Sequence, residues 1–110
     1  MRALKRDLAR LTIDVPYKLK FFNEETEQFT EYVEGHIIYL DMFVNGKLFE
    51  NIYIAIEDSY PLKPPVVYLG EYINHPNVID EDGQICFGDW SPTITLNQIL
   101  WHIYLILCEK

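Results

Sequence analysis

The dipeptide Asn45-Gly46 is the feature that most restricts how this chain can fold. It separates two runs that are rich in β-forming residues, 36–44 and 48–56. A two-residue type I′ turn needs positive φ at both positions, which glycine adopts freely and asparagine adopts better than most residues. The spacing therefore predicts an antiparallel hairpin.

Apolar residues alternate along both predicted strands, as expected when one face of a sheet is buried. The residues predicted to share the buried faces are Ile38, Leu40, Met42, Val44, Ile52, Ile54 and Ile56. We expect these faces to pack on a helix.

Two segments have helical periodicity. Leu4, Leu8 and Leu11 form one apolar stripe and predict a helix over 1–12. A longer stripe predicts a helix over 95–108, where Thr95 and Gln98 have the spacing of a capping box. The longer stripe consists of Leu96, Ile99, Leu100, Ile103 and Leu107.

The remaining segments complete an α+β domain. Strands are predicted over 17–22 and 66–69, and the polar segment 23–34 is predicted to be a turn or a frayed strand. The order predicts an N-terminal helix, a four-stranded antiparallel meander, a long loop and a C-terminal helix. A length of 110 residues predicts a single domain over 1–110.

The loop region contains most of the prolines. Three of them fall within 60–65 and predict an extended, rigid connection rather than a helix. Residues 70–94 are mostly irregular, and long ordered loops are often functional.

Charge is unevenly distributed along the chain. Residues 1–20 carry a net charge of +4, whereas residues 21–110 carry −12. An acidic body argues against a nucleic-acid partner, and no apolar run is long enough to span a membrane. We expect a cytoplasmic protein. The basic segment is either a docking surface for an acidic protein or a solvated helix face.

Four short motifs lie within 60–92, in one order along the chain. They are Tyr60-Pro61-Leu62-Lys63-Pro64-Pro65, His75-Pro76-Asn77, Gly83-Gln84-Ile85-Cys86 and Trp90-Ser91-Pro92. Their identity and order resemble the ubiquitin-conjugating enzyme family, and the preceding hairpin and flanking helices match as well. The resemblance implies the UBC fold and a cysteine that carries ubiquitin or a ubiquitin-like modifier as a thioester.

The resemblance assigns roles within the loop. Cys86 would hold the modifier, and Asn77 would donate to the oxyanion, pin the loop, or do both. His75, Pro76 and Trp90 would shape the loop. Asp89 would orient the amine of a substrate lysine.

Rival carboxylates for that last role are Asp80, Glu81 and Asp82. For each acidic candidate the alternative is a solvated turn carboxylate.

Partner surfaces follow from the same resemblance. The residues expected to meet the activating enzyme are Arg2, Lys5, Arg6 and Arg10. The residues expected to form an apolar patch for a ligase are Leu62, Ser91 and Pro92. The family often has a larger aromatic residue in place of Leu62, so this protein could act without a ligase. No cofactor is expected, and the cysteine and histidine spacing predicts no metal site.

Departures from the family keep other readings open. The segment from Cys86 to Trp90 is shorter than usual, the turn before Gly83 is one residue longer, and the chain ends soon after its last predicted helix. This compact form resembles conjugating-enzyme-like proteins of bacterial ubiquitin-like operons. The alternatives are a catalytically inactive UBC-like or RWD-like binding module, and a thiol hydrolase that uses His75 as its base.

Overall fold

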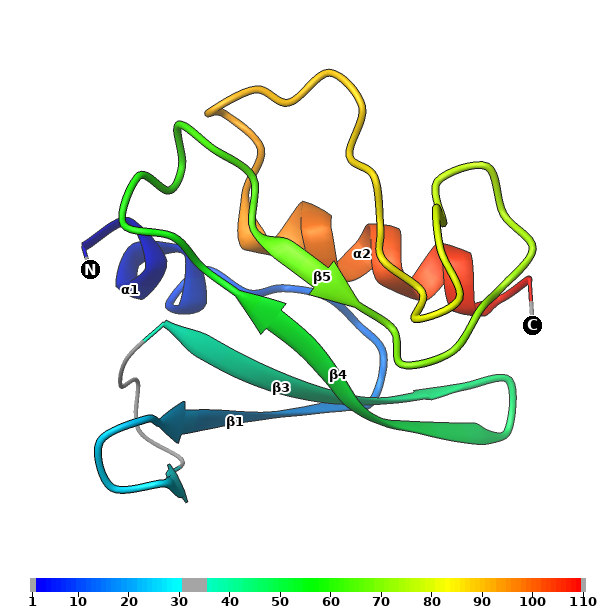
Figure 1. The fold of residues 1–110 in the computed structure, drawn as a ribbon, viewed down its shortest axis with the longest axis horizontal. Coiled ribbons are helices and arrows are strands. Elements are labelled where there is room, and N and C mark those ends of the chain that lie inside the picture. The colour runs from blue at the N-terminus through cyan, green and yellow to red at the C-terminus, as the bar shows by residue number, and fades with distance from the viewer. Residues whose placement is uncertain (1, 31–35, 110) are drawn as a thin grey trace.

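The computed structural model describes residues 2–30 and 36–109 (Figure 1). Its two helices and five strands follow in the order α1 (Arg2–Leu8), β1 (Tyr17–Asn23), β2 (Gln28–Thr30), β3 (Ile37–Val44), β4 (Lys47–Ala55), β5 (Val66–Tyr68) and α2 (Leu96–Leu107). The α+β class is confirmed, as are the helix at each end and the long loop before α2. No helix among the described residues is long and apolar enough to cross a bilayer.

The sheet has one strand more than the sequence predicted. Its order is β2-β1-β3-β4-β5 with antiparallel neighbours throughout, so the predicted meander is β1-β3-β4-β5. The added strand β2 lies in the segment predicted to be a turn or frayed strand, whose last part falls outside the described residues. Asn23 holds the turn between β1 and β2 by accepting the amides of Glu25 and Thr26.

The predicted hairpin forms between β3 and β4. Asn45 and Gly46 have φ values of 51° and 81°, the positive pair that a type I′ turn requires. Val44 pairs with Lys47 directly across the turn. The turn sets the register of the strand ends beside it, and an irregularity between Leu40 and Met42 then shifts the pairing by one residue, so that Ile52 lies opposite Leu40.

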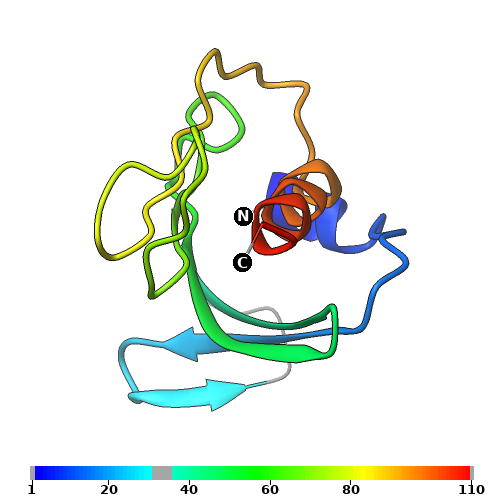
Figure 2. The same ribbon diagram turned by 90° about the vertical axis from the view of Figure 1, so that its right-hand side faces the viewer.

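The core lies between this concave face and α2. All seven apolar residues predicted to line the hairpin face are buried, and so is the whole predicted stripe of α2. Figure 2 shows the sheet curving around α2, with α1 beside the same helix. Burial of these side chains provides the main stabilisation of the fold.

Helix α1 ends earlier than its periodicity predicted. The sequence predicted a helix over 1–12, but α1 ends at Leu8. The side-chain oxygen of Asn97 in α2 accepts the amides of Thr12 and Ile13 at 2.9 and 3.0 Å. Asn97 of α2 thereby holds the segment after α1 in a non-helical conformation.

The proline-rich connection is only partly extended. Residues 57–62 form hydrogen-bonded turns, in which Tyr60 donates to the Glu57 carbonyl and Leu62 to the Ser59 carbonyl. The peptide bond before Pro61 is cis. Figures 1 and 2 both show this connection lying beside the loop that leads into α2.

Candidate active site

The main chain that leads to Cys86 is held by neighbouring segments. Ile85 forms a bridge with Val78 and donates its amide to the Val67 carbonyl at 2.9 Å. The amide of Cys86 donates to the Asn77 carbonyl at 2.7 Å. The thiol is exposed, so an accessible sulfur is carried by a fixed backbone.

Asn77 and Cys86 are joined a second time, through the asparagine side chain. Its Nδ2 donates to the carbonyl of Cys86 at 3.0 Å. Among the described residues the second hydrogen of this amide has no partner. The side chain therefore pins the loop and still presents a donor beside the cysteine.

His75 is part of the turn that positions Asn77. Its Nδ1 accepts the backbone amide of Asn77 at 3.0 Å, and its carbonyl accepts the amide of Val78. Pro76 lies between His75 and Asn77 and is exposed. Within the described residues no imidazole forms a hydrogen bond with the thiol of Cys86.

Trp90 ties the active-site loop to the proline-rich connection. Its Nε1 donates to the Pro61 carbonyl at 2.8 Å. Its ring also contacts Tyr60 and Phe87, with centroids 6.5 and 5.8 Å away. A single indole thus connects the residue after Cys86 to the 60–65 segment.

Phe87 also packs on α2 through His102, with ring centroids 6.1 Å apart. Burial lowers the pKa of His102, and the nearby His75 lowers it further. The imidazole is therefore mainly neutral near pH 7, which suits a ring packed against an aromatic neighbour.

The acidic candidates lie in different settings. Asp89 is exposed and forms no hydrogen bond or ion pair within the described residues. Asp80 instead accepts the amides of Asp82 and Gln84, both at 3.0 Å, and so holds its own turn. Glu81 and Asp82 are exposed. In the described ranges no three histidine, cysteine or acidic residues gather into a metal-binding group.

A groove of about 340 Å³ lies against Cys86. One wall consists of residues 84–88 and the other of residues 63–66, with Glu57 at the same opening. We call this the cysteine groove. The sequence reasoning did not anticipate it, because it depends on how two separate loops lie together.

The three residues of the expected ligase patch come from two adjacent loops. Leu62 is 72% exposed, Pro92 is exposed, and the hydroxyl of Ser91 bonds to that of Thr93 at 2.8 Å. The bond from Trp90 to the Pro61 carbonyl joins the two loops directly before these residues.

The basic residues of the N-terminal segment divide into two kinds. Lys5 and Arg10 are exposed and form no ion pair among the described residues. Arg6 pairs with Asp7 through its Nε at 3.2 Å. The side chain of Arg2 lies outside the described part of the chain.

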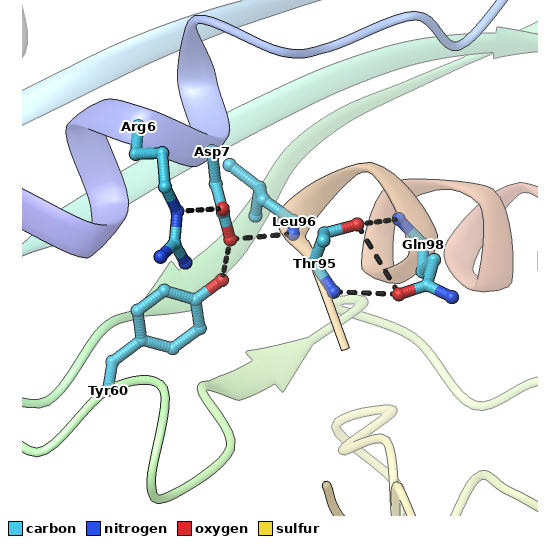
Figure 3. A network of polar contacts seen from close by, with 6 residues as sticks. All are labelled: Arg6, Asp7, Tyr60, Thr95, Leu96 and Gln98. Atoms are coloured by element: carbon cyan, nitrogen blue, oxygen red, sulfur yellow. Dashed lines mark hydrogen bonds and ion pairs between the residues drawn. The ribbon is translucent and has the colours of Figure 1, made fainter. Parts of the chain in front are cut away.

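Asp7 is a residue that the sequence reasoning missed (Figure 3). It is 3% exposed. Its Oδ2 accepts the Tyr60 hydroxyl and, at 3.1 Å, the amide of Leu96, the first residue of α2. One buried carboxylate thereby joins α1, the proline-rich connection and the N-terminus of α2.

A sequence signal for this residue exists. In the helix predicted over 1–12, Asp7 falls on the same side as Leu4, Leu8 and Leu11, so it interrupts an apolar stripe with a charge. A charge in that position predicts a buried partner.

Comparison with known proteins gives one family. The chain matches the family model described as ubiquitin-conjugating enzyme over residues 3–110. It is 27% identical over 118 residues to a NEDD8-conjugating enzyme, UBC12, of Kluyveromyces lactis. That alignment covers 96% of this chain and 58% of the relative, so the chain spans somewhat more than half of the relative's length. No solved structure matches the chain.

Proposed function

This chain belongs to the ubiquitin-conjugating enzyme family, and from that premise we propose that Cys86 carries ubiquitin or a ubiquitin-like modifier as a thioester. The modifier arrives from an activating enzyme and leaves to the lysine amine of a substrate protein. The observation that supports this most directly is the exposed thiol of Cys86 on a backbone bonded twice to Asn77.

Loading is a thiol exchange. The thiolate of Cys86 attacks the carbonyl carbon of the thioester on the activating enzyme, a new C–S bond forms, and the enzyme's own thiolate leaves. Transfer follows when a lysine amine attacks the Cys86 thioester. A C–N bond forms, the C–S bond breaks and Cys86 is regenerated.

Two side chains assist the proposed transfer. Each attack passes through an oxyanion, and the unpartnered N–H of Asn77 can donate to it. Asp89 is free of other bonds within the described residues and would orient the incoming lysine. Asp80 is less suited to that role because it already accepts two backbone amides.

The partner surfaces are part of the same proposal. Arg2, Lys5, Arg6 and Arg10 would contact the activating enzyme, and Leu62, Ser91 and Pro92 would contact a ligase where one takes part. The reaction would take place in the cytoplasm, where both free cysteines stay reduced. Ubiquitin, NEDD8 and the ubiquitin-like proteins of bacterial conjugation pathways are the modifiers to test.

The test is charging of the chain with activating enzyme, modifier and ATP. An adduct that thiols remove should form on the parent chain and be absent from Cys86→Ala. Cys86→Ser should give an ester that resists thiols. Cys108→Ala is the matched control, because Cys108 is the other exposed free cysteine, and it should charge like the parent.

Two results would refute the carrier role. An adduct that persists in Cys86→Ala would place the modifier on another residue. In the second, each modifier is supplied together with its own activating enzyme. Tight binding of a modifier to the chain with no adduct on it would favour the inactive binding module instead.

A further inference from the structure

Side chains, rather than main-chain hydrogen bonds, hold the segment that follows Cys86. In the described part of the chain no amide or carbonyl of residues 87–90 takes part in a hydrogen bond, apart from the bond that the indole of Trp90 donates. Gly88 has a φ of 61°, in the left-handed region that glycine adopts freely. The position of this segment therefore depends on what the side chains of Phe87 and Trp90 contact.

Phe87 borders two separate spaces. It lines the cysteine groove together with Cys86. It also lines a second cavity of about 180 Å³, together with Ile94, Gln98, Ile99 and His102. The phenyl ring is thus a wall of the groove that contains the thiol, and a shift of this ring toward the cavity would change the shape of the groove.

His102 supports that ring from α2. The two ring centroids lie 6.1 Å apart. Ile99 and Ile103 of the same helix are buried in the core, so the imidazole is carried by a fixed element. Its Nε2 is buried and has no hydrogen-bond partner among the described residues.

The neutral imidazole suits this setting better than the charged one. Burial lowers the pKa of His102 below its ordinary value of 6.5, and His75 nearby lowers it further. His75 is the titratable group that acts on His102 among the described residues, and the other residues that line the cavity are uncharged. Protonation makes both ring nitrogens donors. No described residue offers Nε2 an acceptor, so the imidazolium has to turn toward water.

From this contact we propose that His102 is a positioning residue for the reaction at Cys86, which acts through Phe87. The neutral imidazole keeps the phenyl ring in place as a wall of the cysteine groove, so that the acyl group on Cys86 is aligned with the incoming amine. The protonated imidazole leaves the ring, which moves toward the cavity, and the alignment is lost. Because it concerns release of the acyl group from Cys86, this role rests on the proposed function.

The test follows discharge of a Cys86 thioester without the activating enzyme. The Cys108→Ala chain, here the parent, is loaded by thiol exchange with an aryl thioester of a short peptide that ends in glycine, and discharge to free lysine is timed. His102→Ala should slow discharge about tenfold at neutral pH, because Phe87 loses its support. His102→Phe keeps an aromatic ring and should bring the rate to within about threefold of the parent. Leu105→Ala removes an exposed side chain of the same helix, and this matched control should discharge like the parent.

The pH profile separates positioning from a purely structural role. Acid slows every chain by protonating lysine, so the informative quantity is the rate of the parent divided by that of His102→Phe at each pH. This ratio should fall at least about threefold between about pH 7 and pH 5, since only the parent can protonate His102. His75 is present in both chains, so its own titration cancels. A constant ratio would overturn the proposal, as would a His102→Ala chain that discharges like the parent.

NMR of the parent chain gives a second measurement that needs no variant at His102. The amide signals of Phe87 and Gly88 should shift with the midpoint of the His102 imidazole. Signals that follow the midpoint of His75 alone, or that do not titrate, would contradict the proposed role. Neither experiment uses enzymatic charging, so a negative result here leaves the carrier role intact, and a chain that no activating enzyme charges could still show this dependence on His102.

Discussion

At Asn77 a single side-chain amide can serve both structure and chemistry. One hydrogen bonds to the Cys86 carbonyl at 3.0 Å, and the other is free among the described residues. Removal of the amide should therefore affect stability and rate by different amounts. One loop hydrogen bond contributes about 1 kcal/mol to the free energy of unfolding, whereas an oxyanion donor contributes more than that to the rate of thioester discharge.

We predict that Asn77→Ala lowers the free energy of unfolding by about 1 kcal/mol. It should slow discharge of the Cys86 thioester to free lysine by about 10²-fold. Single-turnover discharge and urea unfolding measure the two effects. If discharge slows by less than about threefold while stability falls as expected, Asn77 only holds the loop.

Tyr60 gives a second residue-scale prediction, in alkaline solution. Burial raises the pKa of Tyr60, and the bond to Asp7 raises it further. A phenol whose folded pKa is raised above the unfolded value of 10.0 stabilises the fold at lower pH. That contribution is lost as the pH rises above 10 toward the folded pKa.

Tyr60→Phe should therefore be less stable than the parent by about 2 kcal/mol at neutral pH, since a bond to a buried carboxylate is lost. The difference should shrink above pH 10, because only the parent loses stability through this phenol. Chemical unfolding of both chains across the alkaline range measures the difference. A constant difference would contradict the assignment.

At the scale of elements, α1 and the turn that follows it carry exposed basic side chains as well as the hydrogen bonds of the buried Asp7. Lys5 and Arg10 are exposed, whereas Arg6 is bonded to Asp7. Lys5 and Arg10 can therefore be changed without disturbing the hydrogen bonds of the buried Asp7.

We predict that Lys5→Glu combined with Arg10→Glu raises the KM of the activating enzyme for this chain about tenfold, with kcat little changed. Charges at the rim of an interface act mainly on association. Steady-state charging assays measure this, and the effect should weaken in salt. Lys18→Glu on β1 is the control. An unchanged KM would leave the basic segment as a solvated helix face.

Several elements could be predicted because their signals are local. The turn at Asn45-Gly46 and the capping box of Thr95 with Gln98 both formed as the sequence indicated. The end of α1 could not be predicted, because the amides beyond it bind Asn97, 85 and 84 positions along the chain. β2 is only three residues long and gives too short a pattern to identify.

The candidate site was predictable where motifs mark it. The motifs pointed to Cys86, His75 and Asn77, which the structure brings together. The cysteine groove was not predictable, because its two walls come from segments about 20 positions apart and the pattern of neither one encodes their contact.

At the scale of the molecule, three distant segments meet at Asp7. Its carboxylate binds Arg6, the Tyr60 hydroxyl and the Leu96 amide, and all but Arg6 lie in the interior. Loss of this carboxylate would leave buried donors without acceptors.

Asp7→Ala should lower the free energy of unfolding by about 3 kcal/mol. The exposed Asp14 provides the matched control, and Asp14→Ala should change stability by less than about 0.5 kcal/mol. Urea unfolding gives both values. Equal losses in the two variants would show that the network at Asp7 contributes little.

The bond between Asp7 and Leu96 also bears on how the chain is made. A helix of seven residues is too short to persist alone in water, and its anchor lies 89 positions later. The ribosome releases α1 before α2, so α1 must wait for its anchor until Leu96 has emerged. A nascent chain stalled before residue 95 should expose the apolar face of its sheet and attract chaperones or proteases.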